Sequence, residues 1–112
     1  MEKYFNSKAK ANVRTTETHR AYDLLTPDHG CTAGCKAGIG EHLGLDFPPT
    51  QTHETQEGFY VVSGKGWAIL DGKEHRMEPG TALIVPPGVA HALKRDADVP
   101  CLEVFFFHAA AK

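Results

Sequence analysis

Residues with the chemistry of metal ligands lie in the stretch TQTHETQEGFYVVSG, just before an apolar run. Residues two apart in a strand point to the same side, so Gln51 and His53 are expected to share a face, and Glu57 shares it again if the chain stays extended. His91 begins a later strand, after a Pro-Pro-Gly break. If the two strand starts lie side by side, His53, Glu57 and His91 form a two-histidine, one-carboxylate set, a ligand type of non-haem iron oxygenases.

The elements that must position these residues are short strands. From Glu57 onward, β-rich runs alternate with turn signals at close and regular spacing, which predicts an all-β sandwich or barrel. Asp71-Gly72 indicates a tight hairpin, because both central positions of a type I′ turn need positive φ. Pro86-Pro87-Gly88 must interrupt a strand, because proline supplies no ladder donor. The predicted runs are EGFYVVS, WAIL, KEHRME, TALIV, VAHALKR and PCLEVFFF.

The N-terminal third is expected to contain two further strands, over residues 13–25 and 31–45, the second bending at its glycines. Cys31 and Cys35 then lie on one apolar strand face, about 13 Å apart at the rise of an extended chain. This separation disfavours the alternative of a closed zinc site built from His29, Cys31, Cys35 and His42, unless the stretch is a loop. Apolar residues nowhere follow the helical period for three turns, so no substantial helix is predicted.

Composition is typical of one ordinary globular domain spanning residues 1–112. The chain has 112 residues, 23% of them charged, and a formal net charge of -2, with its basic residues dispersed among the acids. This excludes the basic footprint of a nucleic-acid-binding protein. The sequence also lacks an apolar run of the roughly 20 residues that a membrane span needs. Without a recognisable secretory signal, and with an odd number of cysteines, the expected location is the cytoplasm.

Two spaced motifs resemble those of the cupin superfamily, in the small single-domain prokaryotic form. They are Gln51-x-His53-x3-Glu57-x6-Gly64, within about residues 44–64, and Gly80-x5-Pro86-x-Gly88-x2-His91, within about residues 80–95. The resemblance implies a double-stranded β-helix, a jelly-roll-like barrel, with a divalent metal held at its mouth by motif side chains. The resemblance does not determine the identity of this metal, which can be iron, zinc, nickel or manganese. It further implies a homodimer and a small-molecule ligand or substrate.

Three positions depart from the family pattern. Gln51 stands where the family has its first histidine, and it could coordinate the metal through its carbonyl oxygen, hydrogen-bond a metal-bound water, or do neither. The family's leading glycine falls at Leu45. Arg95 replaces an asparagine and shares a strand face with His91, from which its bidentate fork could fix an anionic substrate. The alternative for Arg95 is a solvated side chain at a strand end.

The resulting prediction is a metal-binding cupin whose ion is held by Gln51, His53, Glu57 and His91. As an enzyme it would act on a small oxygen-bearing anionic or sugar-derived metabolite, by dioxygenase, isomerase, lyase or decarboxylase chemistry according to the metal. The alternative is a non-catalytic module that binds or senses a small ligand, because the sequence offers no general acid or base beyond the ligands. The remaining histidines, at positions 19, 29, 42, 75 and 108, are expected to be surface or core residues.

Overall fold

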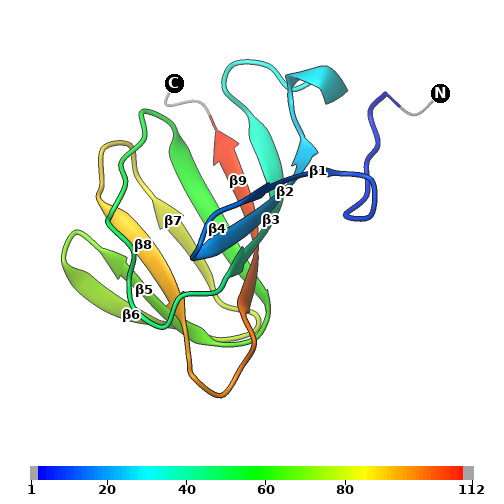
Figure 1. Cartoon of the computed structure of the whole chain (residues 1–112). Coiled ribbons are helices and arrows are strands. Elements are labelled where there is room, and N and C mark those ends of the chain that lie inside the picture. Colours follow the sequence, from blue (N-terminus) through cyan, green and yellow to red (C-terminus); the bar gives the residue numbers. More distant parts are fainter. Residues whose placement is uncertain (1–2, 110–112) are drawn as a thin grey trace.

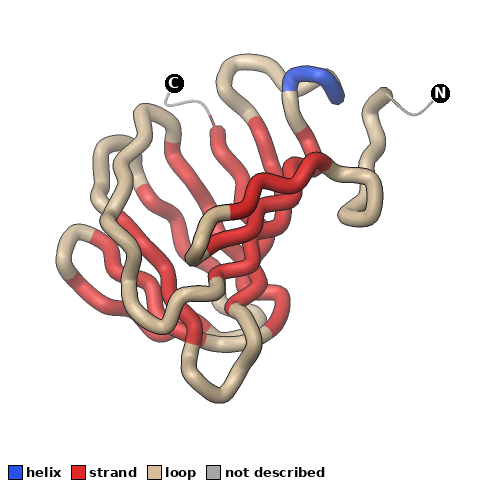
Figure 2. The backbone as a smooth tube through the Cα atoms, in the orientation of Figure 1, coloured by secondary structure: helices blue, strands red, loops and turns tan. Residues whose placement is uncertain are grey.

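The computed structural model describes residues 3–109, which form strands, connecting loops and one short 3-10 helix, η1 (Pro27–His29). Figure 2 shows how little of this part of the chain is helical. None of the described helical segments has the length and apolar character to cross a membrane. The strands are β1 (Asn12–Thr15), β2 (His19–Leu25), β3 (Lys36–His42), β4 (Gln56–Ser63), β5 (Gly66–Leu70), β6 (Lys73–Met77), β7 (Ala82–Val85), β8 (His91–Arg95) and β9 (Leu102–Ala109).

The strands form two antiparallel sheets, one with the order β1-β2-β3-β9-β4-β7 and one with the order β6-β5-β8. β9, from the end of the described chain, lies between β3 and β4, so it joins the early strands to the central ones (Figure 1). This confirms the predicted all-β, jelly-roll-like double-stranded β-helix. It also gives β9 two neighbours from distant parts of the sequence, a pairing that hydrophobic alternation alone does not reveal.

The core lies between the inner faces of the two sheets. Its largest fully buried side chains are Val61, Met77, Leu102 and Val104, and each contributes about 1.5 to 3 kcal/mol through removal of apolar surface from water. On β9 these inner residues alternate with partly exposed ones, as expected for a strand with one buried face. The same alternation carries one polar side chain, His108, to the buried side of the strand.

The predicted hairpin between β5 and β6 is confirmed. Asp71 has φ of 49° and Gly72 has φ of 82°, the pair of positive values that a type I′ turn requires. The Pro-Pro-Gly break likewise forms a turn between β7 and β8, where Gly88 has φ of 79°.

The N-terminal third differs from the prediction in two places. Residues 13–25 form a hairpin of two strands, β1 and β2, rather than one strand. Residues 31–35 form a turn before β3, because Ala33 and Gly34 adopt φ of 56° and 80°. The extended strand on which the separation of about 13 Å between Cys31 and Cys35 was based is therefore wrong for this stretch. The zinc alternative gains nothing from this, since the only metal-type cluster among residues 3–109 lies elsewhere.

Candidate metal centre

Backbone pairing brings the two motifs together at one end of the barrel. Gln51 and His91 exchange two main-chain hydrogen bonds, each 3.0 Å long, and so form an isolated bridge between the loop before β4 and the start of β8. The Gly88 amide donates to the carbonyl of His53 over 2.8 Å and ties the same loop to the Pro-Pro-Gly turn. The predicted meeting of two distant strand starts therefore takes place.

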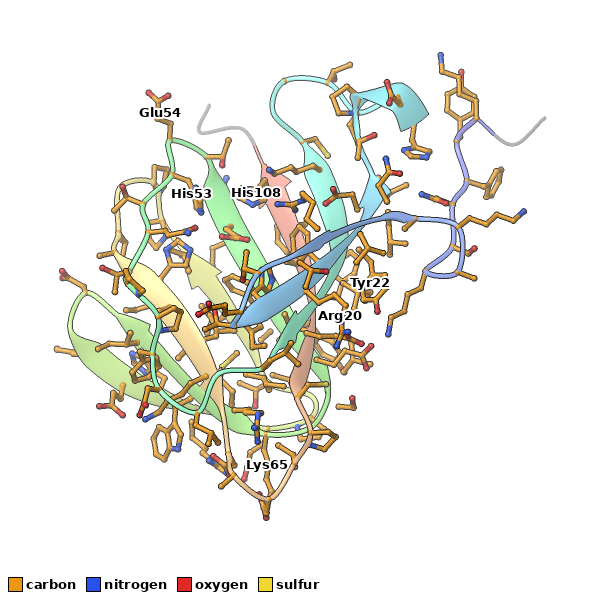
Figure 3. All side chains as sticks on the ribbon, viewed as in Figure 1. Arg20, Tyr22, His53, Glu54, Lys65 and His108 are labelled. Atoms are coloured by element: carbon orange, nitrogen blue, oxygen red, sulfur yellow. The ribbon has the colours of Figure 1, made fainter. Side chains whose placement is uncertain are left out.

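Glu57 is a buried carboxylate, 7% exposed, that contacts three imidazoles. Its Oε1 lies 3.1 Å from Nε2 of His91 and 3.4 Å from Nε2 of His53. Its Oε2 lies 3.0 Å from Nε2 of His108, which is directly opposite Glu57 in the β4–β9 pairing. Figure 3 shows His53 and His108 close together at this end of the barrel, with Lys65 at the other. Three Nε2 atoms thus converge on one carboxylate.

Two of these rings are oriented by hydrogen bonds at their second nitrogen, Nδ1. Nδ1 of His91 lies 3.1 Å from the Val89 carbonyl, and Nδ1 of His108 lies 2.9 Å from the Thr55 hydroxyl. A carbonyl only accepts, so Nδ1 of His91 must carry the proton. In a neutral His91, Nε2 then carries no proton, and its lone pair faces a carboxylate oxygen of Glu57. That contact is favourable only with a proton or another cation between the two atoms.

The pKa values of the rings follow from this geometry. Burial lowers the pKa of His91, but the hydrogen bonds with Glu57 and Val89 outweigh it and raise the pKa above its ordinary value. Burial dominates at His108 and lowers its pKa, although Glu57 acts in the opposite direction. His91 and His108 therefore differ in proton affinity although both contact the same carboxylate, Glu57.

The donor set fits a divalent first-row metal ion. His53, Glu57 and His108 each offer a ligand atom, and these atoms all lie within 4.8 Å of one another. His91 contacts the same carboxylate. Imidazole and carboxylate donors suit iron, nickel, zinc and manganese, and an outer hydrogen bond on the second ring nitrogen is the usual way to orient such a ligand.

Residues 44–107, more than half of the chain, match the family model Cupin_2, described as a cupin domain. The chain belongs to the cupin family. The matched residues include both motifs and the strands β4 to β8, together with most of β9.

Relatives of this cupin include proteins of different size. Acireductone dioxygenase of Bacillus mycoides (strain KBAB4) is 27% identical over 106 residues, which cover 88% of this chain but 59% of that protein. The crystal structure of FeII HppE superposes with a TM-score of 0.82 at 11% identity, covering 94% of this chain and 59% of that one. An RmlC-like cupin from Shewanella frigidimarina NCIMB 400 superposes with a TM-score of 0.78 at 16% identity, covering 97% and 92%. At these identities the two structures support the fold alone.

His108 is the residue of the cluster that sequence reasoning missed. It is 6% exposed, which agrees with the core alternative of the expectation, but that expectation did not include its contact with Glu57. One signal was available in the run LEVFFFHA, where His108 continues the inward alternation of Leu102, Val104 and Phe106. That periodicity places His108 inside the barrel, but it does not identify β4 as the neighbouring strand.

Gln51 and Arg95 take different positions relative to the cavity. Gln51 lines it beside His91, and among the described residues no hydrogen bond joins its carboxamide to the cluster. Arg95 is not among the described lining residues. Its guanidinium donates to the carbonyls of Leu43 at 2.7 Å, Val99 at 2.8 Å and Asp96 at 3.3 Å. These donors fasten two loops, and substrate binding by Arg95 stays a prediction from the sequence.

The cavity at the metal centre has a volume of about 570 Å³. Besides the cluster, it is lined by two cationic side chains, Arg14 and Lys36, and by a second pair of histidines, His19 and His42. Burial, reinforced by the neighbouring His19 and His91, lowers the pKa of His42 to about 3. Burial also lowers the pKa of His19. These two histidines, expected at the surface or in the core, belong to the cavity wall.

The depressed pKa of His42 predicts an acid-sensitive fold. Between about pH 6.5 and pH 3, the unfolded chain is protonated at this residue while the folded chain is not. The free energy of unfolding therefore decreases as the pH is lowered through this range. In metal-free protein, His42→Gln should reduce that slope by up to about 1.4 kcal/mol per pH unit. Denaturant unfolding between pH 7 and pH 4 measures the slope, with His75→Gln on an exposed strand position as the control. A His42 signal titrating near pH 6.5 by NMR would contradict this account.

Proposed function

We propose that this cupin is a divalent-metal-dependent enzyme acting on a small oxygen-bearing anion, with its ion held by His53, Glu57, His91 and His108. The observation that carries the proposal is the convergence of three Nε2 atoms on the two oxygens of one buried carboxylate. A buried carboxylate is costly without a compensating cation. A metal ion supplies that charge to the whole cluster at once.

His108 replaces the imidazole that the first motif lacks. The family's first histidine is Gln51 here, which leaves the motifs with two imidazoles and one carboxylate. His108 enters from β9, directly opposite Glu57, and restores a set of three imidazoles. Gln51 is bridged to His91 through the backbone, and it is the side chain that the proposed set does not need.

The resident ion would polarise substrate oxygens or, if it is iron, support chemistry with molecular oxygen. Two comparisons support an enzyme of this kind: the relative named acireductone dioxygenase, and the neighbour whose structure is that of FeII HppE. Because this chain covers 59% of each of these proteins, their reactions are not transferred to it.

Charge in the cavity favours an anionic substrate. Glu57 is the only carboxylate among the described lining residues, so a dication bound there leaves a net positive charge. Lys36 adds a further positive charge on the wall, whereas Arg14 is compensated by Asp23 through hydrogen bonds of 2.8 and 2.9 Å. A carboxylate-bearing molecule with a second oxygen donor would fit this field.

The second candidate is a non-catalytic module that binds a small ligand through the same ion. It is favoured by the lack of a second carboxylic acid among the described lining residues, which leaves no acidic group to move protons beside the metal. The two candidates share the metal centre and differ only in turnover.

A homodimer fits the outer surface of the large sheet. Apolar side chains that are 39% to 50% exposed gather on the outward faces of neighbouring strands: Tyr60, Val62, Ile84 and Phe107. A contiguous exposed apolar patch is typical of an interaction surface. The homodimer, the cytoplasmic location and the absence of nucleic-acid partners remain predictions from the sequence.

Metal affinity distinguishes the two ligand sets. His108→Ala should weaken Ni²⁺ or Zn²⁺ binding by at least about 10- to 100-fold, since even outer-sphere changes produce losses of this size. Gln51→Ala should leave the affinity within about threefold, well below that range. The double variant Gln51→His/His108→Ala should recover part of the loss by restoring the family's own imidazole. Competition with a chromophoric chelator measures all three, with His75→Ala as the control.

The opposite pattern would contradict the proposed set. If Gln51→Ala weakened metal binding by about 10-fold or more while His108→Ala bound metal normally, the carbonyl oxygen of Gln51 would be the ligand in place of His108.

Turnover separates the enzyme from the binding module. Protein loaded in turn with Fe²⁺, Mn²⁺, Ni²⁺ and Zn²⁺ is incubated with a panel of 2-hydroxy acids, 2-oxo acids and enediols, while oxygen consumption and product NMR are recorded. We expect metal-dependent conversion of at least one compound, abolished in Glu57→Gln because the carboxylate that gathers the ligands is neutralised. Tight binding of these acids with no conversion under any metal would favour the binding module.

A further inference from the structure

A second pair of histidines lines the same cavity as the Glu57 cluster. His19 on β2 and His42 on β3 are direct partners in the β2–β3 register, and their rings stack with centroids 4.6 Å apart and an interplanar angle of 28°. On β2, His19 shares the inner face with the fully buried Ala21. The alternate residues Arg20 and Tyr22 point outward, as Figure 3 shows.

Gly40 leaves room beneath the two rings. A Cβ atom at this position would lie 3.2 Å from Nε2 of His19 and 3.4 Å from Nε2 of His42. Both Nε2 atoms therefore lie over the same point of the backbone, in the room that the missing side chain leaves for the two rings. The sheet thus presents two ring nitrogens together at the cavity wall.

Among the residues that the structure describes, none forms a hydrogen bond with the ring nitrogens of this pair. Within residues 3–109, neither imidazole forms a hydrogen bond, and no side-chain polar atom is both fully buried and unpaired. The ring nitrogens of His19 and His42 must therefore reach open space, and the cavity that both residues line provides it. Two aligned polar groups without partners in a concave site are suited to a ligand.

The chemical state of the rings indicates what they would bind. Burial lowers the pKa of both residues, so each ring is neutral at neutral pH. A neutral imidazole has one N–H donor and one bare acceptor nitrogen. A hydroxyl group also both donates and accepts, whereas a carboxylate only accepts and would leave the bare nitrogen of each ring unpaired. The pair is therefore complementary to hydroxyl groups.

We propose that His19 and His42 form a hydroxyl-binding subsite, and that the substrate is a polyhydroxylated carboxylic acid whose acid end binds at the Glu57 cluster. This inference rests on the proposed function, because the metal centre fixes one end of the molecule. The two sites open on the same cavity of about 570 Å³. A cavity of this volume is within the range of small-molecule sites.

Binding of matched acids to the Ni²⁺-loaded protein tests the subsite. Glycolate can chelate the metal but is too short to extend across the cavity, whereas D-gluconate, D-galactonate and D-mannonate carry the same chelating end and a hydroxylated chain. We expect at least one sugar acid to bind about tenfold or more tightly than glycolate by calorimetry, the gain typical of one or two hydrogen bonds. His19→Phe and His42→Phe should remove that gain while leaving Ni²⁺ and glycolate affinities within about twofold, because neither residue is a metal ligand.

A measurement on the unmodified protein avoids dependence on how the variants fold. Ring ¹⁵N signals of His19 and His42 in Zn²⁺-loaded protein should shift on addition of the tighter sugar acid and stay unchanged with glycolate, with exposed His75 as the internal reference. If glycolate binds but all three sugar acids gain nothing and leave these signals unmoved, the subsite is wrong while the metal centre stands. If glycolate fails to bind the metal-loaded protein, the proposed function fails, and this inference fails with it.

Discussion

The negative charge of Glu57 is the constraint on which the site depends. A carboxylate that is 7% exposed must be matched by positive charge and hydrogen bonds, or it takes up a proton. Three imidazoles meet it, and at least His91 has its Nδ1 proton committed to a main-chain carbonyl. Hydrogen bonds with Glu57 and the Val89 carbonyl raise the pKa of His91, against the effect of burial, so this ring takes up a proton more readily than an ordinary imidazole. Metal binding would release a proton held there, so that affinity and pH are coupled.

The barrel delivers these groups through pairings that are long-range in sequence. β9 lies beside β4, so the penultimate residue of β9 comes opposite the second residue of β4, and this register places His108 against Glu57. The Gln51–His91 bridge and the Gly88–His53 hydrogen bond fasten the loop before β4 to the start of β8. Each contact is made by the backbone, so the ligand positions follow from strand register more than from the side chains themselves. A one-residue slip of β9 would turn His108 outward.

Much of this arrangement is readable in the sequence. The spacing of His53, Glu57 and His91 indicates the site, and Asp71-Gly72 indicates its hairpin, because turn chemistry and side-chain alternation are local properties. His108 escapes the same reasoning because its importance depends on which strand neighbours β9. The turn at residues 31–35 escapes it because Ala33 adopts a positive φ that its residue type does not signal. Alternation leaves Arg95 either facing the cavity or solvated at a strand end, whereas in the structure carbonyls of two loops bind its guanidinium.

The cavity combines two kinds of histidine with opposite electrostatic situations. His91 lies against a carboxylate, which raises its pKa, and His42 lies away from one, so burial lowers its pKa to about 3. The histidines around Glu57 are suited to bind a cation, whereas His42 stays neutral and can donate and accept hydrogen bonds. A single cavity can thus bind a cation at one part of its wall and present uncharged polar nitrogens at another.

The position of the ion relative to the protein tests the central claim most directly. Crystals of Ni²⁺-loaded protein, measured at the nickel absorption edge, locate the metal by anomalous scattering. The account predicts one anomalous peak with Nε2 of His53, His91 and His108 and an oxygen of Glu57 each at about 2.0 to 2.2 Å, the usual range for imidazole and carboxylate ligands of such ions. A peak coordinated by the side-chain oxygen of Gln51, with His108 outside bonding distance, would contradict it.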